Sequence, residues 1–184
     1  LSKDKYSEYE EFVRNHPNGT FTQSVKWTGV KSNWGHEIVV SRDKDGKIVG
    51  GCLVLIRKIP VIGTSFLYSP RGPICDLHDE QVLADLKKGI DELAKKYRAH
   101  QYKMDPNTLM SDSEFIDIAK KLGFKQFYGP EGFETIQARF NYRLYLNGRS
   151  EDEIFKALTQ KTRYNIRVAL KHNVEMRVVG EEHL

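Results

Sequence analysis

The chain has 184 residues and a formal net charge of +4. This length is enough for one globular domain, or for one domain and the beginning of another. A mild excess of positive charge suits a partner that carries phosphate, but many proteins share it, so it identifies no function. No apolar run approaches the roughly 18 residues of a membrane helix, and no signal peptide is present, so we expect a soluble, cytoplasmic protein.

The cysteine and histidine patterns argue against metal and cofactor chemistry. Cys52 and Cys75 do not form a CxxC pair, and the six histidines lack HxxxH or HExxH spacing. The nearest approach to a ligand cluster is the segment Asp-Leu-His-Asp at residues 76–79, which a polar turn before a helix explains equally well. We therefore expect no metal and no cofactor.

Residues 1–68 are predicted to form two helices and three strands. The helices are expected at residues 6–15 and 21–34, and the strands at 37–42, 47–56 and 62–68. Residues 43–46, Asp-Lys-Asp-Gly, read as a hairpin turn in which Gly46 takes positive φ.

The later part of the chain mixes both element types. An amphipathic helix is expected at residues 81–98, followed by a strand at 100–104. Ser111 to Glu114 read as a capping box before a helix that ends at Gly123. A strand is expected at 135–146, then a second capping box at 150–153 opening a helix to Leu158, a basic helix at 160–173 and a strand at 174–179.

This order predicts an α/β (α+β) domain with a mixed, largely antiparallel sheet flanked by helices. Residues 46–54 and the Leu-Gly-Phe at 122–124 resemble the GNAT acyltransferase fold. Coenzyme A enzymes of that fold carry an R/Q-x-x-G-x-G/A loop whose backbone N–H groups hold the pyrophosphate. The only candidate here contains Pro73, which lacks such an N–H, so a coenzyme A acetyltransferase is disfavoured.

One motif, Tyr-Ser-Pro-Arg-Gly-Pro-Ile-Cys-Asp at residues 68–76, reads as a strand that ends in a stiff turn. The turn presents Arg71 and Asp76. An arginine placed in this way can bind a phosphate or carboxylate, and a carboxylate can hold an ammonium group or accept a proton. The alternative is that Arg71 and Asp76 pair with each other and only lock the turn.

A second motif lies in the basic helix. It contains Lys161, Arg163 and Arg167, and no Asp or Glu occurs between Lys156 and Asn173. This face could contact the phosphates of an RNA or of a precursor. The alternative is an ordinary solvated helix surface.

Together with Gln-Ser-Val-Lys-Trp-Thr-Gly-Val-Lys at residues 23–31, the two motifs resemble the Fem family of peptidoglycan bridge aminoacyltransferases. Its members show Y-x-P-R-G-P-x-x-D, K-T-R-Y-N-I-R and Q-x-x-x-W-x-x-V-K at similar separations. The resemblance implies a first GNAT-like subdomain at residues 1–140 and the start of a second at 141–184. Because the chain opens with Leu1 and stops inside that second subdomain, we expect a longer protein, and little activity from this part alone.

The resemblance also implies a reaction. Glycine, alanine or serine would pass from aminoacyl-tRNA to the stem-peptide lysine amine of a lipid-linked or UDP-linked muramyl pentapeptide, with peripheral contact to the cytoplasmic membrane face. The implied roles are catalysis for Asp76, substrate binding for Lys31, Tyr68 and Arg71, and tRNA phosphate binding for Lys161, Arg163 and Arg167. Lys26 is an alternative to Lys31.

Two other functions remain open from the sequence. One is a leucyl/phenylalanyl-type transferase that moves an amino acid from tRNA to a protein N-terminus. The other is a nucleic-acid-binding module without enzymatic activity that uses the basic helix alone.

Overall fold

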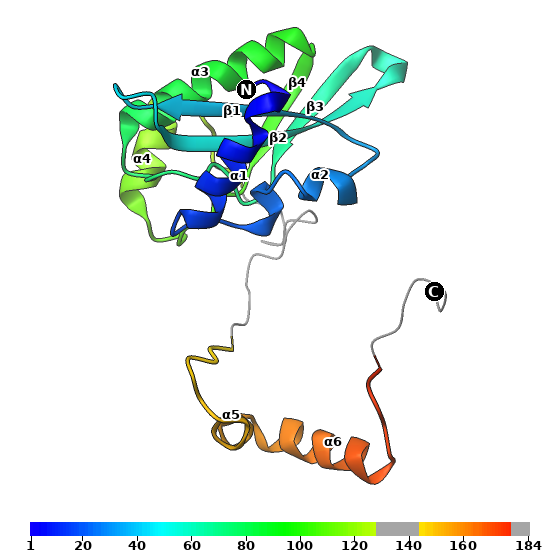
Figure 1. Ribbon diagram of the computed structural model, residues 1–184. Helices are drawn as coiled ribbons and strands as arrows, with labels where there is room; N and C mark the ends of the chain where they lie inside the picture. Colours follow the sequence, from blue (N-terminus) through cyan, green and yellow to red (C-terminus); the bar gives the residue numbers. More distant parts are fainter. Residues whose placement is uncertain (128–143, 178–184) are drawn as a thin grey trace. The chain divides into compact units, whose positions relative to one another are not determined.

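A computed structural model describes residues 1–127 and 144–177 (Figure 1). The chain divides into two units, Leu1–Arg139 and Phe140–Leu184, which are described separately. The described part of the first unit is a sheet flanked by helices. Its strands are β1 (Gly35–Arg42), β2 (Ile48–Ile59), β3 (Thr64–Ser69) and β4 (Ala99–Met104), and its α-helices are α1 (Tyr6–Asn15), α2 (Trp27–Val30), α3 (Glu80–Lys96) and α4 (Ser113–Lys121).

The four strands lie in the order β1-β2-β3-β4. The pairs β1–β2 and β2–β3 are antiparallel, whereas β3 and β4 are parallel and are joined through α3. The predicted mixed, largely antiparallel sheet is therefore confirmed. The parallel pair brings the carboxyl ends of β3 and β4 to the same edge of the sheet.

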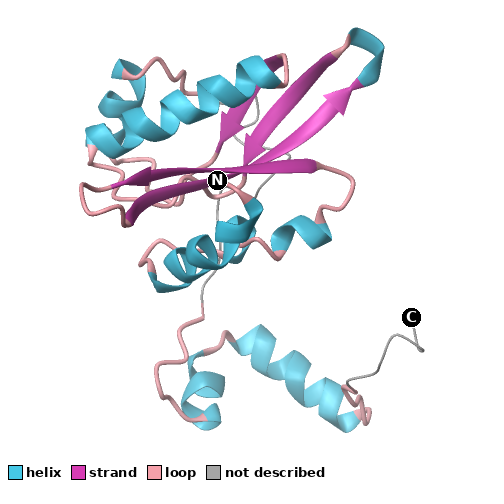
Figure 2. Cartoon of the chain, turned by 45° about the horizontal axis from the view of Figure 1, so that its top comes forward, coloured by secondary structure: helices cyan, strands magenta, loops and turns pink. Residues whose placement is uncertain are grey.

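Helices cover both faces of the sheet, with α1 and α2 on one side and α3 and α4 on the other (Figure 2). The two faces are bridged by β2, whose alternate residues enter different clusters. Leu53 and Leu55 pack with Tyr9 of α1, while Val54 and Ile56 pack against Ile90 of α3. Burial of these side chains on both faces supplies the main driving force for the fold of this unit.

Two adjacent glycines in β2 allow the helices to approach closely. A Cβ on Gly50 would lie 2.5 Å from Val82 Cγ1 of α3, and one on Gly51 would lie 2.6 Å from Tyr9 Cε2 of α1. Because the two residues face opposite sides of the strand, each glycine makes room for a different helix.

Most predicted elements of the first unit are confirmed within a few residues, and Gly46 has a φ of 81°. The helix expected at 21–34 is wrong. The structure has a 3-10 turn at Phe21–Gln23 and the single turn of α2. The break occurs where Glu10 accepts hydrogen bonds from Ser24 Oγ at 2.7 Å and from the Val25 N–H at 2.8 Å, and Ser24 is extended. The capping box expected at Ser111 is also wrong, because Asp112 caps α4.

The second unit contains α5 (Glu151–Ala157) and α6 (Gln160–Lys171). The predicted capping box at Ser150 and Glu153 is confirmed. Of the strand expected at 135–146, residues 135–143 lie outside the described part, and Leu144–Leu146 are not in a strand. Of the strand expected at 174–179, residues 174–177 are not in a strand and 178–179 lie outside the described part. No helix in residues 1–127 or 144–177 is long and apolar enough to span a membrane.

Candidate functional site

The turn that follows β3 presents Arg71 in an unusual backbone conformation. Arg71 has a φ of 53°, the left-handed region that non-glycine residues seldom adopt. Beyond the turn the chain returns to β2, where Ile74 exchanges backbone hydrogen bonds of 2.8 and 2.9 Å with Gly51. The turn is thus tied to the sheet on both sides, by β3 before it and by this bridge after it.

Asp105, the first residue after β4, meets this turn. Its Oδ1 accepts a hydrogen bond from the Tyr68 hydroxyl at 3.0 Å and another from the Arg71 backbone N–H at 3.0 Å. Its Oδ2 lies 3.8 Å from Arg71 Nε. These three residues, which we call the Tyr68–Arg71–Asp105 cluster, come from the adjacent carboxyl ends of β3 and β4.

The carboxylate of Asp105 is partly withdrawn from solvent. Its side chain is 30% exposed, but Oδ2 is buried and accepts no hydrogen bond from any residue in the described ranges. Burial raises the pKa of Asp105, although the hydrogen bonds from Arg71 and Tyr68 oppose the change. A buried carboxylate oxygen with an unused lone pair can hold an ammonium group or accept a proton.

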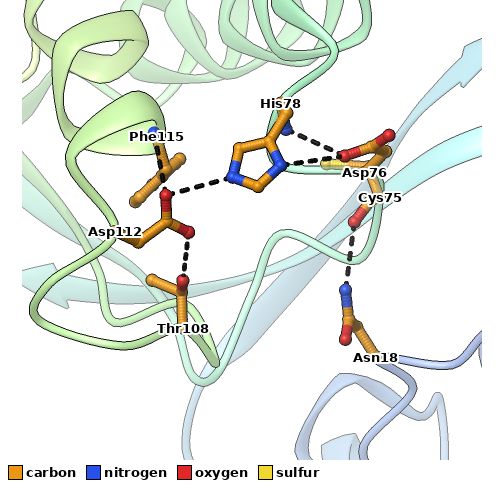
Figure 3. Close-up of polar contacts among 7 residues, drawn as sticks. All are labelled: Asn18, Cys75, Asp76, His78, Thr108, Asp112 and Phe115. Carbon is orange, nitrogen blue, oxygen red and sulfur yellow. Dashed lines mark hydrogen bonds and ion pairs between the residues drawn. The ribbon is translucent and has the colours of Figure 1, made fainter.

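Asp76 lies in a different environment (Figure 3). Its side chain is 74% exposed, and Oδ1 accepts the His78 backbone N–H at 2.9 Å. The His78 ring also lies against Asp112, with Nε2 3.0 Å from Oδ1, and this hydrogen bond raises the pKa of the imidazole. Arg71 and Asp76 do not form the ion pair that the sequence left open, and the Arg71 Nε lies instead 3.8 Å from a carboxylate oxygen of Asp105.

His78, Asp76 and Asp112 do not form a metal-binding site. Within the described ranges, no group of three or more His, Cys, Asp or Glu side chains could hold a metal ion.

Lys31 lies at the carboxyl end of α2. Its ammonium is 5.7 Å from the centre of the Trp27 ring, a distance at which a cation is attracted to the ring face. Trp27 contacts the exposed ring of Phe21 edge-on, at 5.3 Å between centroids.

The cationic side chains of α6 differ in the contacts that they make. The Arg163 guanidinium donates to the backbone carbonyls of Lys156, at 3.0 Å, and Leu158, and so links the start of α6 to the end of α5. The Arg167 guanidinium lies 5.4 Å from the Phe155 ring of α5. Lys161 is exposed. Neither α5 nor α6 contains a buried residue.

A model of the FemAB family matches residues 5–184. The chain belongs to the FemAB family. Among its relatives are lipid II:glycine glycyltransferases of Staphylococcus aureus, one of them 29% identical over 96% of this chain and 43% of its own length. A second, from S. aureus strain RF122, is 30% identical over the same shares. The chain therefore spans less than half the length of these curated relatives.

Solved structures agree with the family and with the fold. A crystal structure of FemX superposes with a TM-score of 0.72 at 26% identity, over 90% of this chain and 42% of that one. A probable acetyltransferase and an acetyltransferase of Trypanosoma brucei each give a TM-score of 0.50, at 8% and 15% identity. They cover 79% and 77% of this chain and 95% and 96% of their own lengths. The predicted GNAT-like fold of this FemAB chain is confirmed.

The sequence pointed to Tyr68 and Arg71 of the cluster but missed Asp105. The available signal was Met104-Asp105-Pro106, a carboxylate directly after a strand-like run. What could not be read from the sequence is that this strand lies beside β3 and parallel to it. Asp76 is closer to Arg71 in the sequence, whereas the pairing of β3 with β4 brings Asp105 to the turn.

Proposed function

We propose that the complete protein is an aminoacyltransferase that builds peptidoglycan interpeptide bridges. In the proposed reaction an amino acid moves from aminoacyl-tRNA to the stem-peptide lysine amine of a muramyl pentapeptide, in the cytoplasm. Membership of the FemAB family supports the reaction class, and the named activity of the S. aureus relatives favours a lipid-linked acceptor. The observation that carries the proposal is the Tyr68–Arg71–Asp105 cluster, because it offers the proton acceptor that this chemistry needs.

The reaction is attack of an amine on an ester. A lysine amine has a pKa of about 10.4, so only about one molecule in 2,500 is neutral at pH 7. This shortage corresponds to about 4–5 kcal/mol of barrier. A group that accepts the proton during the attack reduces that barrier.

We assign the proton acceptor to Asp105 rather than to Asp76. The Asp105 carboxylate, whose side chain is 30% exposed, accepts one proton from the amine as the amine nitrogen bonds to the ester carbonyl carbon. The bond from that carbon to the ribose oxygen then breaks, and the ribose oxygen takes up the proton that the Asp105 carboxylate had accepted, which restores the base. The raised pKa of Asp105 makes it a better base than a fully solvated aspartate, whereas Asp76 is exposed and engaged with His78.

The remaining residues are proposed to bind the substrates. Tyr68 and the backbone of Arg71 fix the carboxylate, and the Arg71 guanidinium also favours an anionic group of the acceptor beside it. Lys31 keeps its proposed role at the pyrophosphate of the precursor, on the resemblance of its motif. In α6, Lys161 is the stronger candidate for tRNA phosphate contact, because Arg163 is occupied by carbonyls of the same unit.

The reaction can be tested directly with the complete protein. It is mixed with radiolabelled glycyl-, alanyl- or seryl-tRNA and with lipid-linked or UDP-linked muramyl pentapeptide. We expect label on the stem-peptide lysine, and none when the tRNA is replaced by the free amino acid. Label on a protein N-terminus instead would support the leucyl/phenylalanyl-type alternative, and folded protein that labels neither acceptor would contradict the proposal. Residues 1–184 alone are expected to show little or no transfer.

Binding of tRNA has its own test. Lys161→Ala in the complete protein should weaken tRNA binding equally for all sequences, and should reduce the slope of log affinity against log salt by about one. Arg163→Ala should mainly weaken the junction between α5 and α6. An unchanged salt slope in Lys161→Ala would remove Lys161 from the proposed tRNA contact.

A further inference from the structure

The peptide unit between Pro70 and Arg71 is held at both ends. The Pro70 carbonyl oxygen accepts hydrogen bonds from Gln23 Nε2 at 2.9 Å and from Thr22 Oγ1 at 3.1 Å. The N–H at the other end of the same peptide belongs to Arg71 and donates to Asp105 at 3.0 Å. Because the peptide is planar, its carbonyl and N–H point in opposite directions, and orienting one orients the other.

Gln23 is itself fixed to the centre of the sheet. It has no exposed surface, and its Oε1 accepts the Leu53 N–H of β2 at 2.8 Å. Its Nε2 also lies 3.3 Å from the Leu53 carbonyl. Only one orientation of the side-chain amide satisfies both the Leu53 N–H and the Pro70 carbonyl. A buried amide with these partners has little freedom to move.

The backbone of Arg71 needs such support. Its φ of 53° is unfavourable for a residue with a Cβ and persists only where the surroundings hold it. The neighbouring Gly72 packs directly on Gln23, since a Cβ at Gly72 would lie 2.7 Å from the Gln23 Cδ.

We propose that Gln23 and Thr22 are positioning residues of the Tyr68–Arg71–Asp105 cluster, which act by orienting the Pro70–Arg71 peptide toward the Asp105 carboxylate. The inference rests on the proposed function, because it concerns the same site. Hydrogen bonds in series also polarise one another, so two donors on the Pro70 carbonyl strengthen the Arg71 N–H as a donor. Neither Gln23 nor Thr22 touches a substrate in this role.

Loss of this positioning should change the titration of Asp105. Among the described residues, the titratable or charged groups that interact with its carboxylate are Arg71 in the turn, Tyr68 on β3 and the buried Tyr102 on β4. Gln23 and Thr22 are both uncharged. A change in the titration of Asp105 after substitution of either one therefore arises from geometry rather than from a lost charge.

The test uses the complete protein labelled with ¹³C at aspartate carboxyl carbons, with Asp105 assigned from its Asp105→Asn variant. Thr22→Val removes the hydroxyl at nearly constant volume, Thr22→Ser keeps it, and Gln23→Met removes the amide. We expect the titration midpoint of Asp105 to rise in Thr22→Val, to rise further in Gln23→Met and to stay in place in Thr22→Ser. Transfer should nevertheless fall about fivefold in Thr22→Val, the effect of one ordinary hydrogen bond, because a carboxylate that has lost its orientation is poorly placed to take the proton, and this outweighs its higher basicity. Transfer should recover in Thr22→Ser.

The outcomes separate this inference from the function on which it rests. A lower Tm in Thr22→Val with an unchanged Asp105 midpoint would overturn the inference, because the role would then be only structural. If Gln23→Met does not fold, Thr22→Val decides alone. A raised midpoint with unchanged transfer would support the positioning role and contradict the assignment of Asp105 as proton acceptor.

Discussion

Replacing Asp105 by asparagine removes the charge and keeps the shape. The asparagine oxygen can still accept from the Tyr68 hydroxyl and the Arg71 N–H, both of which lie at 3.0 Å. Since the pKa of Asp105 is raised, the folded protein holds this proton more tightly than the unfolded chain does. At a pH above the pKa that Asp105 has in the unfolded chain, the ionised carboxylate therefore lowers the stability of the folded protein. At a pH below that value the effect disappears. We expect Asp105→Asn to be as stable as the parent protein or more stable.

The rate of transfer, in contrast to the stability, should fall in Asp105→Asn. General-base assistance contributes about 10²- to 10⁴-fold, which corresponds to about 3–5 kcal/mol of barrier. The assay measures thermal or urea unfolding together with the rate of transfer from aminoacyl-tRNA to the muramyl acceptor, for the complete protein. Loss of transfer without loss of stability is typical of a residue kept for function rather than for folding.

Asp76→Asn is the matched control. Its side chain is 74% exposed and its contact with the His78 N–H can be kept by the asparagine oxygen, so we expect transfer within about twofold of the parent protein. The reasoning is refuted if Asp76→Asn loses transfer while Asp105→Asn keeps it. It is also refuted if Asp105→Asn loses transfer only in proportion to a loss of folded protein.

Three further predictions concern stability and reactivity. Gly72→Ala should destabilise the protein by about 1–3 kcal/mol in urea unfolding, because its Cβ would overlap a fully buried side chain, whereas Gly29→Ala, with open space around it, should not. Neither Cys52 nor Cys75 should react with iodoacetamide until the protein unfolds, since both are buried and burial raises the pKa of Cys75 to about 12; mass spectrometry would detect early labelling. His78→Ala should lower the free energy of unfolding more at about pH 6 than at about pH 8.5. The pKa of His78 is raised by Asp112, so the charged imidazole stabilises the fold fully below 6.5, and this stabilisation is lost as the pH rises through the pKa of the folded state. An equal effect of the substitution at both pH values would exclude the His78–Asp112 ion pair as the cause.

Local sequence patterns predicted most of the helices and strands of the first unit. The pairing of β3 with β4, which is not a local property, determines which residues form the Tyr68–Arg71–Asp105 cluster. The helix at Tyr6–Asn15 and the turn at Gly46 follow from apolar spacing and from glycine placement, both of which are local properties. The expected helix at 21–34 was wrong because Glu10, from a different element, supplies hydrogen bonds that compete with helix formation. Asp105 also depends on residues that are distant in the sequence. Its partners, Tyr68 and Arg71, are set by the pairing of β3 with β4 and not by neighbouring residues.

The parallel pairing of β3 and β4 also affects how the cluster assembles during folding. Arg71 and Asp105 are 34 positions apart, and the chain between them includes all of α3. Closing a loop of this length costs entropy before any contact in the cluster can compensate for it. Formation of the cluster should therefore follow the docking of α3 on the sheet, and contacts of this separation slow folding relative to local ones. A substitution under α3 could then prevent assembly of the cluster without altering any residue in it.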